Sequence, residues 1–333
     1  MLELIFLGTA ASAPSIQRGL PAQMLLWRDE RFLIDCGEGT QRQILRSGLG
    51  FRHLQRVLLT HGHLDHILGL GGLISTFSRW EAVDRLEIYG GRHALDRVED
   101  LIFRVVLRGA RLPVPVSMVD IHPGVLLENE EFVVKAFPVV HRGPDCFGYL
   151  FREKSRRPFL PERAAALGVP VGPVRRDLVN GQAITLDDGR VISPDDVLGP
   201  NRPGVSIAFI GDAARVDNLL DEVRGADLLV CEATYLERDL EMAQRFGHLT
   251  ARQAAELAQA AGVRLLALNH LSQRYRVSDI LNETQPIFDQ TLVTRDFDHI
   301  TVTRDKITVS NEELKDDTVS EAGVPETMGE ADI

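Results

Sequence analysis

The chain has 333 residues, a formal net charge of −11, 44% hydrophobic residues and 26% charged residues. This length suffices for one large domain or two small ones, and the composition is that of a globular protein. No apolar run approaches the roughly 18 residues that a membrane-spanning helix needs, and the acidic balance at first disfavours a nucleic-acid partner.

The start of the chain and its cysteines indicate a cytoplasmic location. MLELIFLGTAAS has no basic segment before its apolar residues and enters strand-like sequence directly, so we expect no signal peptide. The cysteines are three in number and widely spaced: Cys36, Cys146 and Cys231. An odd, scattered set argues against a disulfide framework and for a reducing compartment.

The first half of the chain reads as strands with a few helices. Strands are predicted over 2–9, 22–27, 31–37, 57–60, 86–90, 116–122 and 132–141, with 22–27 and 31–37 forming a hairpin. Helices are predicted over 38–49 and 66–77. Residues 153–204 then break this rhythm with Pro and Gly and show no long apolar period, so we expect an irregular, flexible arm.

The second half alternates strands and helices. Strands are predicted over 206–212, 226–235 and 264–270, helices over 217–225 and 249–263, and a closing hairpin over 297–309. Thr250 and Gln253 form a capping box at the start of the second helix. Residues 311–333 carry eight acids and one base without apolar periodicity, which predicts a disordered tail. The organisation is therefore one α/β domain over 1–310, including the 153–204 arm, and an acidic tail.

The segment HGHLDH directly follows the buried strand at 57–60 and concentrates metal-ligand side chains. His61, His63, Asp65 and His66 lie within six positions. Further candidates end other strands, namely His141, Asp212 and His270. Zinc takes imidazole and carboxylate ligands, usually four per ion, so this set is too large for one open site. Five His and two Asp suit a pair of Zn²⁺ ions, with Mn²⁺ or Fe²⁺ as alternatives, better than Mg²⁺ or Ca²⁺.

HGHLDH resembles the HxHxDH motif of the metallo-β-lactamase superfamily. That resemblance implies an αββα sandwich with a dinuclear site between its sheets. It also implies how the ligands divide: His61, His63 and His141 on one ion, Asp65, His66 and His270 on the other, and Asp212 bridging both.

Further segments, in order along the chain, resemble the ribonuclease Z family. They are LGTAASAPS at 7–15, DCGEGTQRQ at 35–43, HRGPDCFGY at 141–149, CEATY at 231–235, GHLTARQAA at 247–255 and NHLSQRY at 269–275. The resemblance covers residues 2–309. It implies a zinc-dependent endoribonuclease that removes the 3′ trailer from precursor tRNA by hydrolysing a phosphodiester, and a homodimer.

The resemblance also assigns roles to individual residues. Asp65 would orient the attacking water and accept its proton, His248 would protonate the leaving group, and Glu232 would hold His248 in the required tautomer. The implied substrate contacts are Ser272 and Arg274 beside His270, Arg18 in the first loop, and Gly168, Pro170, Gly172 and Pro173 in the arm. The arm sequence LGVPVGP at 167–173 resembles the family's tRNA-gripping exosite, and the basic residues around it suit a phosphate backbone.

Four positions depart from the family pattern: Gly19, Cys146, Ala213 and Cys231. None removes a candidate ligand, although Ala213 removes a hydroxyl beside Asp212 that would tune metal affinity. Two other functions remain open. A hydrolase of small phosphodiesters or other esters would use the same metal site without the arm, and a non-catalytic RNA- or partner-binding protein would use the metals structurally.

Overall fold

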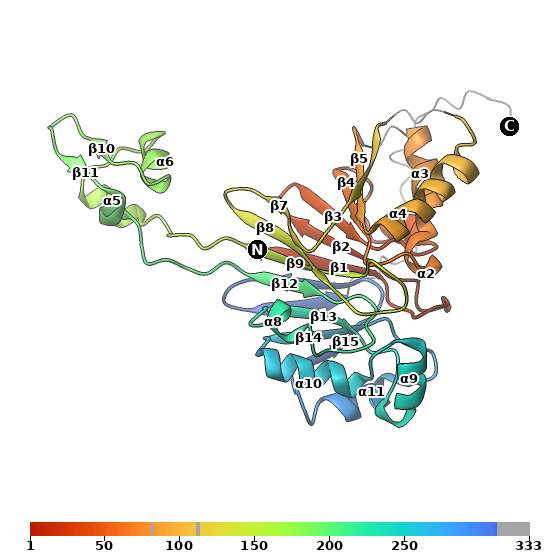
Figure 1. Ribbon diagram of the computed structural model, residues 1–333. Helices are drawn as coiled ribbons and strands as arrows, with labels where there is room; N and C mark the ends of the chain where they lie inside the picture. Colours follow the sequence, from red (N-terminus) through yellow and green to blue (C-terminus); the bar gives the residue numbers. More distant parts are fainter. Residues whose placement is uncertain (81–82, 111–113, 312–333) are drawn as a thin grey trace.

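Two β-sheets face each other at the centre of the molecule (Figure 1). The computed structural model describes residues 1–80, 83–110 and 114–311. The predicted acidic tail, 311–333, therefore lies almost wholly outside the described residues, except for its first residue. Among the described residues, no helix is long and apolar enough to cross a membrane.

The N-terminal sheet has eight strands and is completed by the end of the chain. Its order is β17 (Ile307–Asn311), β16 (Asp298–Val302), β1 (Leu2–Gly8), β2 (Ala22–Trp27), β3 (Glu30–Ile34), β4 (Leu54–Leu58), β5 (Leu86–Gly90) and β6 (Val116–Asp120). Strands β1, β2 and β3 form antiparallel pairs, which confirms the predicted hairpin, and β3 to β6 run parallel.

The C-terminal sheet has seven strands. Its order is β15 (Thr291–Val293), β14 (Leu265–Asn269), β13 (Leu228–Glu232), β12 (Ser206–Phe209), β9 (Phe147–Glu153), β8 (Phe132–Pro138) and β7 (Gly124–Glu128). Strands β12 to β15 run parallel, while β9 is antiparallel to both β8 and β12. The parallel strands of each sheet thus send their carboxyl ends to one edge of the sandwich, where ligand sites of α/β proteins form.

Helices cover the outer faces of both sheets (Figure 1). The N-terminal sheet carries α1 (Thr40–Arg46), α2 (Leu64–Ile67), α3 (Gly69–Trp80), α4 (Arg92–Glu99) and a π-helix, Asp100–Val106. The C-terminal sheet carries α8 (Leu220–Val223), α9 (Leu240–Phe246), α10 (Ala251–Ala261), α11 (Val277–Thr284) and a 3₁₀ turn, Glu237–Asp239. The predicted αββα sandwich is confirmed, and so is the capping box of Thr250 and Gln253 that starts α10.

Three hydrophobic clusters hold these four layers together. The central one fills the space between the sheets with aromatic side chains, such as Phe32, Phe151 and Phe209, that are almost fully buried. A second packs the N-terminal sheet against its helices, and a third packs the C-terminal sheet against α10, whose inward face is mostly alanine. The small side chains let α10 lie close to the sheet whose strand ends carry His270 and Asp212.

The arm is a folded module rather than the irregular segment that its sequence predicted. It contains α5 (Pro161–Ala166), α6 (Val174–Val179), β10 (Ile184–Thr185), β11 (Val191–Ile192) and α7 (Pro194–Val197). Six buried residues form its own core: Ala164, Val169, Leu178, Ile192, Val197 and Leu198. Two extended strands of chain, paired at Arg156 and Arg202, connect it to the body and hold it far out (Figure 1).

Several predicted elements differ in length, and others escaped prediction. The helix expected over 38–49 spans only Thr40–Arg46, because Gly39 at its start and Gly48 after its end adopt positive φ angles. The helix α4 with its π-helical extension, the strands β7 and β9, and the helices α9 and α11 were not predicted. These elements are short, with five to eight residues each, so a sequence period is hard to detect in them and packing against the sheets contributes to their formation.

Candidate metal centre

The HGHLDH segment is placed by close backbone packing where β4 ends and α2 begins. His63 is the N-cap residue of α2, and the next turn brings Asp65 and His66 onto the same side. The turn is tied to the preceding loop by hydrogen bonds from the Cys36 N–H to the His66 carbonyl, 2.8 Å, and from the Gly69 N–H to the Cys36 carbonyl, 2.9 Å. A Cβ atom on Gly69 would lie 2.0 Å from the Gly37 carbonyl oxygen, so this approach requires glycine.

The other three candidate ligands arrive from the C-terminal sheet. His141 follows β8, Asp212 follows β12 and His270 follows β14. His270 has a φ of +53°, a conformation that non-glycine residues rarely adopt and that clusters at functional sites. The Nδ1 atom of His141 lies 2.6 Å from the Gly247 carbonyl oxygen, which fixes its ring and turns Nε2 inward.

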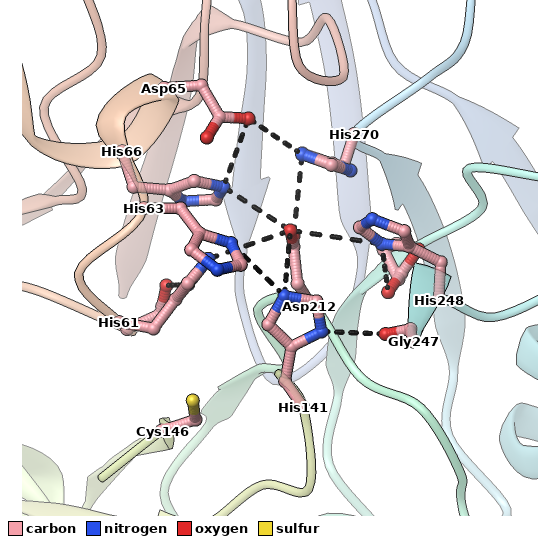
Figure 2. Close-up of polar contacts among 12 residues, drawn as sticks. His61, His63, Asp65, His66, His141, Cys146, Asp212, Gly247, His248 and His270 are labelled. Carbon is pink, nitrogen blue, oxygen red and sulfur yellow. Dashed lines mark hydrogen bonds and ion pairs between the residues drawn. The ribbon is translucent and has the colours of Figure 1, made fainter. Parts of the chain in front are cut away.

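The carboxylate of Asp212 lies at the middle of the cluster (Figure 2). Its Oδ2 atom is 3.7 Å from His61 Nε2, 3.6 Å from His66 Nε2 and 3.8 Å from His141 Nε2, and its Oδ1 atom is 3.4 Å from His270 Nε2. These separations exceed hydrogen-bond length. They suit two ligands of one ion, since ligand atoms about 2.0–2.1 Å from a tetrahedral zinc lie roughly 3.3 Å apart.

The seven candidate ligands separate into two groups that could each hold a metal ion. One is His61, His63, His141 and Asp212, and the other is Asp65, His66 and His270. A third combination joins Asp212, His248 and His270. Three imidazole Nε2 atoms (His61, His66 and His270) and Asp212 Oδ1 are buried without a hydrogen-bond partner, which is costly unless something binds them. The donor set therefore fits cations.

Charge and burial set the protonation states of two of the candidate ligands, Asp65 and His63. Burial would raise the pKa of Asp65, but the neighbouring His270 and His66 lower it to about 2, so this side chain is a carboxylate at neutral pH. Burial, with the charge of His141, lowers the pKa of His63 to about 4, so its imidazole is neutral. Neutral imidazoles and ionised carboxylates are the ligand forms that metals need.

His248 and Glu232 form a pair at the rim of the cluster. The Nδ1 atom of His248 lies 3.1 Å from Glu232 Oε1, and Glu232 is 1% exposed. Burial lowers the pKa of His248, but the charge and hydrogen bond of Glu232 outweigh it and raise the pKa to about 9. The ring of His248 stacks on that of His270, with centroids 5.4 Å apart. The structure thus brings the predicted proton donor and its carboxylate to the predicted ligands.

The predicted substrate-binding residues have different surroundings. Arg274 is exposed and Ser272 half-buried on the loop after His270, with the Ser272 hydroxyl accepting the Arg274 N–H at 3.3 Å. Arg18 is half-buried and donates from Nη1 to the Thr9 hydroxyl and to the Thr294 carbonyl, both at 2.6 Å. The Arg18 side chain therefore ties the first loop to the body of the protein, and its role as a substrate contact stays a prediction.

The arm residues lie on an exposed loop between α5 and α6. All four predicted contacts are exposed: Gly168, Pro170, Gly172 and Pro173. The guanidinium of Arg175 braces this loop by donating to the carbonyls of Pro170 at 3.0 Å and Val169 at 3.1 Å. Part of the basic charge that the sequence placed in the arm is thus used to shape the loop.

Residues behind the ligands were missed by the sequence reasoning. Asp35, Thr60 and Thr234 are buried and contact the imidazoles of candidate ligands. The sequence held a signal for two of them, because Asp35 and Thr60 also lie just past the ends of strands β3 and β4.

Ala213, one of the positions that depart from the family pattern, is fully buried and donates its N–H to Glu232 at 2.7 Å.

The cysteines that depart from the family pattern carry no ligand role in the described cluster. These two cysteines, Cys146 and Cys231, are free and buried, as is Cys36, which matches the pattern. The Cys146 thiol lies 3.7 Å from the carbonyl oxygen of Pro144 and 3.9 Å from that of Gly143. Burial raises the pKa of Cys146 to about 11, so it remains a neutral thiol.

Comparison with known proteins gives the superfamily and the fold. The model of the beta-lactamase superfamily domain matches residues 197–271, and the model of the anti-Pycsar protein Apyc1 matches residues 2–141. The metallo-beta-lactamase fold protein YhfI from Bacillus subtilis superimposes with a TM-score of 0.63 at 17% identity, over 89% of this chain and 97% of that one. The chain therefore has the metallo-β-lactamase fold.

Nearer relatives match over almost the whole chain. Human tRNase Z, short form, superimposes with a TM-score of 0.64 at 26% identity, over 90% of this chain and 99% of that one. The ribonuclease Z of Brevibacillus brevis is 40% identical over 314 residues, 90% of this chain and 97% of the relative. The ribonuclease Z of Bradyrhizobium sp. (strain ORS 278) is 47% identical over 302 residues, 91% of this chain and the entire relative. The chain belongs to the ribonuclease Z family.

Proposed function

We propose that this chain is a metal-dependent endoribonuclease that hydrolyses the phosphodiester at the 3′ side of precursor tRNA and so removes the 3′ trailer. The observation that carries the proposal is the cluster of seven candidate ligands beside the His248–Glu232 pair. Structural metal sites need no protonated side chain beside them, whereas hydrolysis of a phosphodiester needs a proton for the leaving oxygen. The names and extent of the relatives support tRNA as the substrate.

Two zinc ions are the proposed cofactors, with Mn²⁺ or Fe²⁺ as alternatives. The first would be held by His61, His63, His141 and Asp212, and the second by Asp65, His66 and His270, with Asp212 shared. Bound ions would supply Lewis acidity to the phosphate oxygens and lower the pKa of water at the site. The imidazole-rich set favours borderline ions over Mg²⁺.

Asp65 is the proposed orienting group for the nucleophile. Its Oδ2 atom accepts the Ser12 N–H at 3.1 Å and lies 3.6 Å from His270 Nε2, so the carboxylate is fixed at the mouth of the cluster. With a pKa of about 2, it is ionised and can accept a hydrogen bond from an attacking water molecule. The same hydrogen bond turns a lone pair of that water towards phosphorus.

His248 is the proposed proton donor to the leaving ribose oxygen. With a pKa of about 9 it is protonated at neutral pH. Glu232 accepts the Nδ1 proton, so the Nε2 proton is the one available for transfer. Burial of Glu232, and its second hydrogen bond from the Ala213 N–H, keep this orientation fixed.

The arm and the rim loop are the proposed RNA contacts. Ser272 and Arg274 lie beside His270, where the scissile phosphate would bind. In the arm, the loop with Gly168 and Gly172 is exposed, and the exposed basic side chains of Arg163 and Arg176 flank it. Such contacts hold phosphates without reading base sequence. An arm held far from the metal centre suits a long folded RNA and has no use with a small ester.

We extend the proposal to location and assembly. A cytoplasmic enzyme is supported by the three buried free thiols, because such residues are typical of reducing compartments. A homodimer is supported by the family resemblance, in which the arm of one subunit grips RNA bound to the other. We also propose that residues 1–310 form one catalytic unit that includes the 153–204 arm.

The test removes the arm and keeps the paired residues by which it is connected to the body. The backbones of Arg156 and Arg202 exchange two hydrogen bonds, of 2.9 and 2.8 Å, so residues 157–201 can be replaced by an Asn-Gly turn. We expect the variant to lose cleavage of a 3′-extended precursor tRNA and to keep hydrolysis of a small chromogenic phosphodiester. If the full-length protein leaves the precursor uncut and hydrolyses the small diester, the enzyme is instead a hydrolase of small phosphodiesters.

A further inference from the structure

The residues behind the cluster repeat the same arrangement in both halves of the sandwich. Each half has one buried carboxylate, one buried threonine beside it, and two histidines that contact this pair. In the N-terminal half they are Asp35, Thr60, His61 and His66, and in the C-terminal half Glu232, Thr234, His248 and His270. We propose that Asp35 and Thr60 are positioning residues that orient one candidate ligand of each metal ion.

Asp35 makes three hydrogen bonds with two residues. Its Oδ1 atom accepts the backbone N–H of Thr60 at 2.8 Å, and its Oδ2 atom accepts the Thr60 hydroxyl at 2.8 Å. The same Oδ2 atom lies 2.8 Å from Nδ1 of His66. Asp35 is 3% exposed, so water does not compete for these bonds. Its φ of +57° is rare outside glycine, so the surrounding contacts hold it in a strained conformation.

The direction of each hydrogen bond follows from the carboxylate. An ionised carboxylate only accepts, so both His66 Nδ1 and the Thr60 hydroxyl must donate to Asp35. The Thr60 hydroxyl has a single proton, and that proton is used. Its oxygen, 3.0 Å from Nδ1 of His61, can then only accept from that nitrogen. Both rings therefore carry their proton on Nδ1.

This assignment leaves the Nε2 lone pairs of His61 and His66 facing the cluster. Both Nε2 atoms are buried without a hydrogen-bond partner. They belong to different metal groups, His61 to the first and His66 to the second. One carboxylate thus sets the tautomer of a ligand on each ion, for His66 directly and for His61 through the Thr60 hydroxyl. Such outer contacts typically affect metal affinity by 10- to 100-fold.

The threonine is itself fixed from the opposite sheet. Its carbonyl accepts the N–H of Phe147, at the start of β9, at 2.8 Å. A Cβ atom on Gly211 would lie 2.7 Å from the Thr60 Cβ, so the chain just before Asp212 packs directly on this side chain. Asp35, Thr60 and Glu232 also line one cavity of about 20 Å³ behind the ligands. The contacts therefore hold Thr60 at a fixed distance from the ligands of both sheets.

The C-terminal half differs from the N-terminal half in what its carboxylate contacts. The Thr234 hydroxyl donates to Glu232 and lies 2.8 Å from Nδ1 of His270. Glu232 also contacts His248, which belongs to the proposed proton-donating pair. The C-terminal carboxylate thus joins a candidate ligand to the proton donor, whereas Asp35 joins two candidate ligands. We assign a purely metal-positioning role to Asp35 and Thr60 on this difference.

The inference rests on the proposed function, because it assumes that the cluster holds two ions. The test measures stepwise zinc removal from the purified full chain by a competing chelator, with metal counted per chain. Thr60→Val keeps the shape and removes the hydroxyl, and we expect about 10-fold weaker binding at the ion that involves His61 only. Thr60→Ser keeps the hydroxyl and should bind both ions as the unmodified chain does.

Asp35→Asn should weaken both ions. The asparagine side chain has one NH₂ group, which replaces either Oδ1 or Oδ2 of Asp35. In the first orientation it faces the Thr60 N–H, and in the second it faces the His66 Nδ1–H. Two donors cannot form a hydrogen bond with each other, so one bond is lost in either orientation. The matched controls lie elsewhere: Thr284→Val removes a buried hydroxyl that donates to the Ile280 carbonyl, and Asp227→Asn alters a carboxylate that accepts the Ser206 N–H. Both controls should leave zinc binding unchanged.

The outcomes separate the two proposals. If the unmodified chain fails to hold two zinc ions, the proposed metal centre and this inference are both wrong. If it holds two, and Thr60→Val binds them as tightly as Thr60→Ser, the positioning role is wrong. If Asp35→Asn weakened the binding of only one zinc ion, the proposal that Asp35 orients a ligand of both ions would equally be wrong. Should Asp35→Asn not fold, the Thr60→Val and Thr60→Ser pair alone decides, since Val is isosteric with Thr.

Discussion

At the scale of single residues, the protonation state of His248 governs the reaction proposed here. Its pKa is raised to about 9, although burial alone would lower it, because Glu232 stabilises the charged ring. The proton is therefore present below pH 9 and is lost as the pH rises through that value. We expect kcat to fall on the alkaline side with an apparent pKa of about 9. A pH–rate profile for precursor cleavage checks this.

The matched variant for that profile is Glu232→Gln. It removes the charge that raises the pKa, so the alkaline fall should move to lower pH. His248→Ala should lower kcat by about 10²–10⁴-fold, the usual contribution of a positioned acid, with KM little changed. An unchanged kcat in His248→Ala would show that another group protonates the leaving oxygen.

Residue-level reasoning from sequence found the atoms that face the cluster and missed those behind them. The rule that polar residues past strand ends form sites located His141, Asp212 and His270, which the structure brings together. The same rule applies to Asp35 and Thr60, but one carboxylate or hydroxyl past a strand end is too common to stand out. Arg18 stays a predicted substrate contact, although its hydrogen bonds with Thr9 and Thr294 could not be predicted from the sequence.

At the scale of elements, the close contact between α3 and the loop after β3 controls stability. A Cβ on Gly69 would lie 2.0 Å from a backbone oxygen of Gly37, which cannot rotate away. Gly69→Ala should therefore lower the free energy of unfolding by about 1–3 kcal/mol. Two residues on in the same helix, a Cβ on Gly71 would have its nearest neighbour at 3.5 Å.

Gly71→Ala serves as the control for that substitution. It adds the same methyl group to the same helix without a clash, and alanine favours helix by about 1 kcal/mol. The control should be as stable as the unmodified protein or more so. Denaturant unfolding of both variants gives the comparison, and equal stabilities would mean that the loop and helix can separate freely.

Sequence patterns predicted the long elements and failed on the arm for a physical reason. The helix α10 has buried positions at helical spacing over eleven residues and a capping box, so its sequence specifies it. The arm helices have six, six and four residues, too few for a detectable period, and share a core of only six residues. Its fold arises from contacts between short segments.

At the scale of the whole molecule, metal ions should contribute to stability because the candidate ligands come from both sheets. A ligand that binds only the folded state at 100 times its Kd adds about 2.7 kcal/mol. Removal of the metal should therefore lower Tm by several degrees, and adding zinc back should restore it. Differential scanning calorimetry of the stripped and reloaded protein checks this. An unchanged Tm would contradict ligation across the two sheets.

The arm should give RNA binding its dependence on salt. Each phosphate neutralised by a basic side chain adds a slope of about −0.9 to log K against log salt in duplex nucleic acid. We expect KM for precursor tRNA to rise steeply with salt in the full chain and less steeply after replacement of residues 157–201. If log KM against log salt had the same slope in both proteins, the phosphate contacts would lie on the body of the protein and not on the arm.

The N-terminal sheet combines strands from both ends of the chain, and this order of the strands also determines when the enzyme can first act. The N-terminal sheet pairs β1 with β16, so its edge is open until almost the last described strand has been made. The cluster needs Asp212 and His270 from late in the chain to complete what residues 61–66 begin. During synthesis, a growing chain thus carries five of the seven candidate ligands before Asp212 is made, and His248 follows later. The full set of candidate ligands and the proposed proton donor is therefore present only after the residues up to His270 have been made.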